Sequence, residues 1–146
     1  MVLQSRKCLQ RARSSRTSGV ANNLLHFQDH ETLYLAGVSD FNSGPRDVRL
    51  ALVNVPYFAK AICFTHSPDI IRRLPPTCAL TIAGHTHGGQ VRLPFIGRPI
   101  VPSRFGYSAG LIRENGKYLF VSPGIGTSIL PVRFGVPPEV SILEIR

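Results

Sequence analysis

The sequence predicts a strand-rich α/β domain with short helices. From residue 31 onward, short apolar runs alternate with Gly, Pro, Asn and Asp. Apolar runs bounded by turn residues are typical of strands. Asn115-Gly116 lies between two such runs and predicts a two-residue hairpin turn, because both residues tolerate positive φ. The helical candidates are short, so the strands are expected to form the frame of the domain.

Each expected element rests on a local signal. The helices are expected at 45–55 and 68–74, where Pro45 and Pro68 stand in the first turn and their missing N–H breaks no hydrogen bond. The strands are expected at the apolar runs that turn residues enclose. These runs cover residues 33–38, 61–66, 79–84, 90–94, 109–114, 117–122 and 139–145.

Length and hydropathy limit the possible architectures. A chain of 146 residues is long enough for one domain with one core. An apolar content of 43% argues against wholesale disorder. No apolar run reaches the roughly 18–20 residues of a membrane helix. We therefore expect no transmembrane segment, a cytoplasmic or peripheral membrane location, and a domain over 31–146 after a basic segment, 1–30.

The net charge of +9 raises the question of nucleic-acid binding. More than half of this excess lies before the first acidic residue, Asp29. The residues responsible are Arg6, Lys7, Arg11, Arg13 and Arg16. The remaining charge is modest for a domain of this size. Composition therefore argues against a nucleic-acid partner, although a basic nucleic-acid-binding domain stays open as an alternative.

Cysteine usage predicts unpaired thiols. Cys8, Cys63 and Cys78 are widely spaced and form no CxxC pattern. An odd number without such spacing argues against a disulfide framework and against a cysteine zinc site. Cys63 and Cys78 lie in apolar runs, so both are expected to be small core residues. This usage favours a reducing compartment.

Histidines follow two of the predicted strands. His66 ends the run 61–66, while His85 and His87 follow the run 79–84 in a turn rich in glycine. The crevice beyond the carboxyl ends of strands is the usual ligand site of α/β sheets. Neutral imidazole suits zinc, iron, nickel and manganese. The pattern predicts a metal site, but solvated histidines at ordinary strand ends remain the alternative.

The residues around these histidines resemble a known family. THSPD at 65–69 and GHTHGGQ at 84–90 closely resemble the last two motifs of calcineurin-like metallophosphoesterases. The stretches LYLAGVSD, VSPGIGTS and LPVRFGVPPEVSILEI resemble the C-terminal half of the YaeI/YkuE-like phosphodiesterase branch. The resemblance covers residues 31–146 and preserves the order of the motifs. It implies a partial metallophosphoesterase domain, with 1–30 as a poorly matching segment.

The resemblance implies a fold and a reaction. The fold would be the C-terminal half of a four-layer α/β/β/α sandwich, and the enzyme a phosphodiesterase or pyrophosphatase with two divalent ions such as Mn, Zn or Fe. His66 and His85 would bind one metal and His87 the other. The substrate would be a phosphoester, lipid-linked in some relatives. Arg133 would contact a phosphate oxygen, or instead form an ion pair with Glu139.

The same resemblance implies that part of the site is missing. The family motifs DxH, GDxxD and GNH[DE] occur nowhere in this sequence. We therefore expect a truncated chain that keeps only some of the metal ligands and is weakly active or inactive alone. A non-catalytic metal- or phosphate-binding module is the alternative. Half of the fold would also expose apolar sheet surface and favour self-association.

Overall fold

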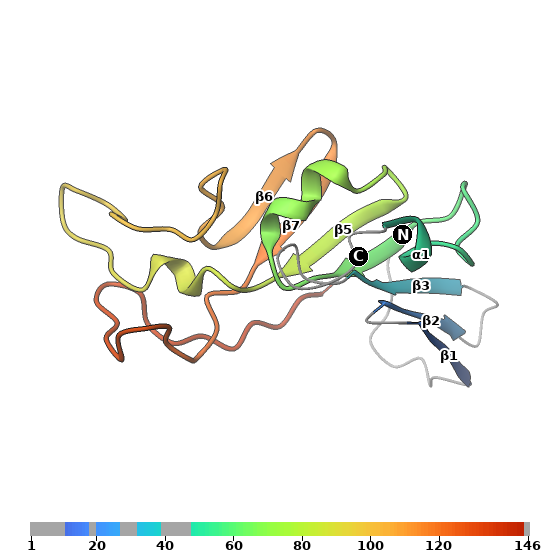
Figure 1. Ribbon diagram of the computed structural model, residues 1–146, viewed down its shortest axis with the longest axis horizontal. Helices are drawn as coiled ribbons and strands as arrows, with labels where there is room; N and C mark the ends of the chain where they lie inside the picture. Colours follow the sequence, from blue (N-terminus) through green and yellow to red (C-terminus); the bar gives the residue numbers. More distant parts are fainter. Residues whose placement is uncertain (1–10, 18–19, 27–31, 39–47, 145–146) are drawn as a thin grey trace.

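The structure, a computed structural model, describes residues 11–17, 20–26, 32–38 and 48–144. They form a seven-stranded mixed sheet in the order β1-β2-β3-β4-β5-β7-β6 (Figure 1). The strands are β1 (Arg11–Thr17), β2 (Val20–His26), β3 (Thr32–Gly37), β4 (Ala61–Phe64), β5 (Cys78–Ala83), β6 (Gly110–Glu114) and β7 (Lys117–Val121). The helical segments are α1 (Val48–Ala51) and two 3₁₀ turns, η1 (Pro68–Arg73) and η2 (His87–Gly89).

Parallel pairing defines the centre of the sheet. Strands β3, β4, β5 and β7 run parallel to one another, whereas β2 is antiparallel to both β1 and β3, and β6 is antiparallel to β7. Strands β6 and β7 form the predicted hairpin, with Asn115 and Gly116 both at positive φ. The expected strand-rich α/β class with short helices is confirmed.

Several expected elements were wrong in detail. Residues 90–94 and 139–144 form no strand, because the first segment makes only isolated bridges and the second pairs with no described strand. The helix expected at 68–74 is the 3₁₀ turn η1, and that expected at 45–55 is the four-residue α1, with 45–47 outside the described residues. Strands β1 and β2 lie in the segment 1–30, where no strand was expected.

The core lies between one face of the sheet and η1. Ile70 and Ile71 of η1 are fully buried, as are Leu119 and Val121 of β7. None of the helices in the described part of the chain is long and apolar enough to cross a bilayer.

The expectation of two unpaired core thiols was wrong. Cys63 of β4 and Cys78 of β5 are fully buried and joined by a disulfide, with a Cα–Cα distance of 5.7 Å. Neighbouring strands bring the two residues together although they lie 15 positions apart in the sequence. The inference of a reducing compartment therefore loses its basis, because it rested on unpaired cysteines.

The opposite face of the sheet is apolar and partly open. One row of register partners crosses four strands and consists of Phe64, Ile82, Phe120 and Leu111. Phe64 is 41% exposed and Leu111 is 65% exposed. This agrees with the expected exposure of apolar sheet surface. Self-association through this face remains a prediction.

Lys117 fixes the C-terminal end of η1. Its Nζ donates hydrogen bonds to the carbonyl oxygens of Ile71 and Leu74, both at 2.6 Å, and the residue is buried. Burial lowers the pKa of the Lys117 ammonium from its ordinary value, and the charge of Glu114 opposes that shift. The last carbonyl groups of a helical turn lack partners within it, so a buried ammonium is a strong cap.

Replacing Lys117 with methionine is expected to lower the free energy of unfolding by about 2 kcal/mol, because two buried carbonyl groups lose a charged donor. Urea unfolding followed by circular dichroism measures the change. Lys60→Met is the matched control, since the exposed Lys60 donates to the Pro76 carbonyl at 3.4 Å. Equal stability losses in the two variants would show that the Lys117 cap contributes nothing specific.

Candidate functional site

Parallel pairing of β4 and β5 brings two histidines together. The carboxyl ends of parallel neighbours lie at the same edge of a sheet. The pairing continues past the strand ends, because Thr65 N–H donates to the Ile82 carbonyl at 3.0 Å and Gly84 N–H donates to the His66 carbonyl at 3.1 Å. His66 therefore lies beside the turn that carries His85.

The two imidazoles meet edge to face. His85 Nδ1 lies 2.9 Å from His66 Nε2, and the ring centroids are 4.7 Å apart at an interplanar angle of 64°. This distance allows a hydrogen bond between neutral rings. It also suits a shared cation, because two metal–nitrogen bonds of about 2.1 Å at a right angle place the nitrogens about 3.0 Å apart. The donor pair therefore fits a divalent metal of the imidazole-binding kind.

The turn that carries His85 has an unusual backbone. His85, His87 and Gln90 have φ values of 71°, 49° and 52°, in the left-handed region that favours glycine. Such conformations cost free energy and are found preferentially at functional sites. Two bonds hold the turn in place. The buried Thr86 donates through Oγ1 to the Ser108 carbonyl at 2.6 Å, and Arg98 Nε donates to the Gly88 carbonyl at 2.8 Å.

His87 has a different neighbour from the His66–His85 pair. A Cβ built on Gly126 would be 4.0 Å from His87 Cε1, so this ring faces the loop that follows β7. Within the described ranges, no group of three or more His, Cys, Asp or Glu side chains could hold a metal ion. The structure thus brings together His66 and His85, while the role of His87 as the ligand of a second metal stays a prediction.

Arg133 is engaged by backbone carbonyls. Its Nη2 donates to Pro123 O at 2.7 Å and Gly124 O at 3.0 Å, and its Nε donates to Gly126 O at 2.9 Å. The alternative partner Glu139 accepts a hydrogen bond from Ser141 Oγ instead. Arg133 therefore organises the loop beside His87. A phosphate contact by this side chain remains a prediction that the structure does not test.

Two polar residues play roles that the sequence did not reveal. Asp69 is buried and accepts hydrogen bonds from Ser103 Oγ at 2.6 Å and Arg104 N–H at 2.9 Å. Gln90 donates through Nε2 to the Leu130 and Val132 carbonyls, each at 3.0 Å. Both sets of partners lie more than 30 residues away in sequence, so no local pattern could have indicated them.

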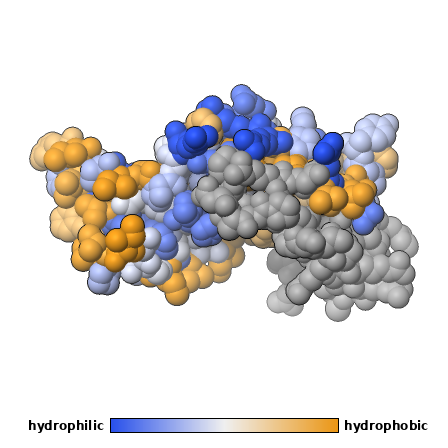
Figure 2. Space-filling model, viewed as in Figure 1, coloured by the Kyte–Doolittle hydropathy of each residue, from blue (hydrophilic) through white to orange (hydrophobic). Residues whose placement is uncertain are grey.

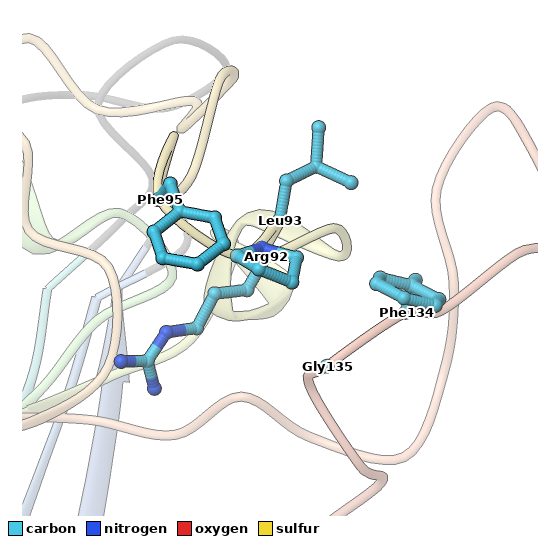
Figure 3. Close-up of a pocket in the computed structure, with 7 residues that line it drawn as sticks. Arg92, Leu93, Phe95, Phe134 and Gly135 are labelled. Atoms are coloured by element: carbon cyan, nitrogen blue, oxygen red, sulfur yellow. The ribbon is translucent and has the colours of Figure 1, made fainter.

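Two hollows border the segment that follows η2. One, of about 390 Å³, has His87 and Gln90 in its wall together with Ile100, Ile129 and Leu130. The other, of about 530 Å³, is shown in Figure 3. There Phe95 and Phe134 come from two different loops, and the Arg92 guanidinium extends away from Phe134. The second hollow contains no histidine or carboxylate, whereas the first has His87, one of the three candidate ligands, in its wall.

The sequence is similar to known proteins over part of their length. The chain is 30% identical over 125 residues to the uncharacterized metallophosphoesterase YkuE of Bacillus subtilis, covering 84% of this chain and 43% of YkuE. It is 36% identical over 122 residues to an uncharacterized metallophosphoesterase of Aquifex aeolicus, covering 78% of this chain and 46% of that protein. The chain is related to the metallophosphoesterases. A third relative, the phosphodiesterase YaeI of Escherichia coli, is 35% identical over 88 residues, 58% of this chain and 32% of YaeI.

The metallophosphoesterase match is partial. The chain spans less than half the length of each of these three relatives. No family model matches the chain, and no solved structure matches it. The relatives therefore support the expected kinship with YkuE and YaeI over part of their length, whereas the activity of a whole metallophosphoesterase is a separate question for this chain.

Proposed function

We propose that this chain supplies the histidine side of a divalent-metal site for phosphoester hydrolysis. His66 Nε2 and His85 Nδ1 would be ligands of one ion, and His87 a ligand of a second. The observation that carries the proposal is the 2.9 Å approach of two imidazole nitrogens at the ends of adjacent parallel strands. The kinship with YkuE and YaeI, named as a metallophosphoesterase and a phosphodiesterase, supports it.

The chemistry follows from the donor set. Imidazole nitrogens suit manganese, zinc and iron. Such ions, when bound, polarise a phosphoryl oxygen and lower the pKa of a bound water, so that hydroxide forms at neutral pH. The contribution of this chain is positional. The strained turn at His85 and the Thr86 hydrogen bond to Ser108 hold the imidazoles at fixed positions, so that the ligands need not reorganise when a metal binds.

A complete dinuclear site needs more ligands than the described residues bring together. Neutral imidazoles do not reduce the repulsion between two dications, whereas a bridging carboxylate does. The motifs that supply carboxylates in the family are absent from this sequence. We therefore propose that this chain alone hydrolyses phosphoesters only slowly, and that further ligands come from chain segments outside it.

A non-catalytic metal-binding module is the second candidate. It is favoured by the absence, within the described ranges, of any cluster of three potential ligands. Two histidines can hold a cation that retains several waters without activating a nucleophile. This candidate predicts metal binding without turnover, whereas the first predicts turnover that depends on the metal.

Metal-dependent hydrolysis of bis(p-nitrophenyl) phosphate tests the first candidate. The expected result is slow turnover with Mn²⁺ or Zn²⁺ that falls at least tenfold in His85→Ala, because one of two convergent ligands is lost. Measurements of p-nitrophenolate release after removal of metal and after its return provide the comparison.

His26→Ala is the matched control for this assay. Residue 26 pairs with Thr32 at the start of β3, and β3 runs parallel to β4, so residue 26 lies at the opposite edge of the sheet from His66. This variant should keep full turnover. Turnover that persists without metal, or that is equal in His85→Ala and the unaltered chain, would overturn the proposal. Metal binding without turnover would favour the second candidate.

A further inference from the structure

We propose that the hollow beside His87 binds the apolar ester group of the phosphoester substrate, an aryl or alkyl group. This inference rests on the proposed function and specifies its substrate class. The hollow, which we call the ester pocket, has a volume of about 390 Å³ and is lined by Thr86, His87 and Gln90 of the histidine turn and by Ile100, Ile129 and Leu130 of two later segments.

The walls of the ester pocket are mostly apolar. Apart from His87, no residue that lines it has an ionisable side chain, and most of the other large side chains are aliphatic. Ile129 is 101% exposed, Ile100 is 75% exposed and Leu130 is 66% exposed. Large aliphatic side chains gain free energy when a ligand removes them from water. A charged or strongly hydrated group would find no hydrogen-bond partner among these aliphatic side chains.

The apolar wall is attached to the histidine turn by specific bonds. Gln90 donates through Nε2 to the carbonyl oxygens of Leu130 and Val132 and accepts at Oε1 from the Ser128 N–H. The segment with Ile100 also lies close to the histidine turn. A Cβ added to Gly89 would lie 3.0 Å from the Ile100 carbonyl oxygen, so the two backbones are in close contact there. These contacts hold both aliphatic segments beside η2, and the exposed side chains are therefore presented at a defined place.

The position of the pocket identifies the occupant. His87 lies in its wall, and in the proposed function this imidazole serves a metal that holds the phosphate. A group in the pocket is therefore adjacent to the phosphate, where the ester substituent must be. Figure 2 shows hydrophobic surface gathered at the end of the molecule that carries the loops after β5 and β7. A pocket of this size accommodates an aromatic ring or a short alkyl chain.

The test measures binding by nuclear magnetic resonance of isoleucine methyl groups. Phenol without metal probes the pocket alone, whereas methyl phosphate and phenyl phosphate with Zn²⁺ probe the phosphate site without and with an apolar group. The methyl signals of Ile100 and Ile129 are expected to shift with phenol and with phenyl phosphate. Phenyl phosphate should bind at least tenfold more tightly than methyl phosphate.

Ile129→Asp is expected to remove this tenfold preference, because it weakens the binding of phenyl phosphate more than that of methyl phosphate. The side chain is fully exposed, so the substitution leaves the core intact. Ile142→Asp is the matched control, because Ile142 is 93% exposed and does not line the pocket.

A series of alkyl phosphates from hexyl to dodecyl distinguishes a small soluble ester from a lipid. An affinity that stops rising at hexyl indicates a small soluble ester, and one that continues to rise indicates a lipid.

The outcomes separate this inference from the proposed function. No shift at Ile100 and Ile129 with phenol or phenyl phosphate overturns the pocket, even if metal-dependent hydrolysis is found. Equal affinity for phenyl and methyl phosphate also overturns it. Methyl shifts with phenol alone, without any effect of phosphate and metal, overturn the ester assignment together with the hydrolase proposal.

Discussion

Reducing the disulfide between Cys63 and Cys78 is expected to lower the free energy of unfolding by about 3 kcal/mol. The bond closes a loop of 15 residues between adjacent strands. A cross-link of this length removes chain entropy from the unfolded state, and the loss corresponds to about 3 kcal/mol in the loop-closure description. The bond joins β4 to β5, the two strands whose carboxyl ends carry His66 and His85.

Urea unfolding of oxidised and reduced protein measures this effect. Both cysteines are fully buried, so reduction is carried out in denaturant before refolding with reductant. A Cys8→Ser background removes the third thiol and leaves a single possible pair. The intact mass under non-reducing conditions reports the bond directly. Two free thiols in the native oxidised protein, or identical unfolding midpoints, would contradict the expectation.

Replacing Gly88 with alanine is expected to lower the free energy of unfolding by about 3 kcal/mol. Gly88 has a φ of 63°, and an added Cβ would lie 2.7 Å from Val136 Cγ1 and 3.2 Å from Pro123 Cβ. The left-handed backbone costs an alanine about 1 kcal/mol, and overpacking a filled site costs about 1–3 kcal/mol. The turn that carries His85 and His87 is expected to shift as a result.

Gly110→Ala separates the two contributions to this loss. Gly110 also has a positive φ, of 87°, but nothing lies within 4 Å of an added Cβ. The Gly110→Ala variant should therefore lose only the backbone contribution to the free energy of unfolding, about 1 kcal/mol. Chemical denaturation compares the two variants. If Gly88→Ala loses no more stability than Gly110→Ala, the result contradicts close packing of Gly88 against Val136.

Local sequence signals were sufficient for part of the fold. The hairpin of β6 and β7 follows from Asn115-Gly116, because the turn residues fix the pairing of the strands on either side. The strands predicted at 90–94 and 139–144 were wrong, because an apolar run becomes a strand only when another strand pairs with it. In the described part of the chain Val140 and Ile142 remain 80% and 93% exposed. Composition likewise gave no sign of β1 and β2.

The candidate site shows the same division. The approach of His66 and His85 could be predicted, because parallel strands end at one edge of the sheet and each histidine follows such an end. The partners of Arg133 and Asp69 could not be predicted, because they depend on how distant loops pack. The pairing of Cys63 with Cys78 required the register of β4 and β5, which no spacing rule supplies.

The most direct test of the histidine site is a titration with Co²⁺, followed by visible absorption. Cobalt accepts the same imidazole ligands as zinc, and its spectrum reports nitrogen ligation. We expect the unaltered chain to give a ligand-field band that both His66→Ala and His85→Ala abolish and that His26→Ala leaves intact. An identical band in the unaltered chain and in both strand-end variants would contradict the assignment of this imidazole pair as metal ligands.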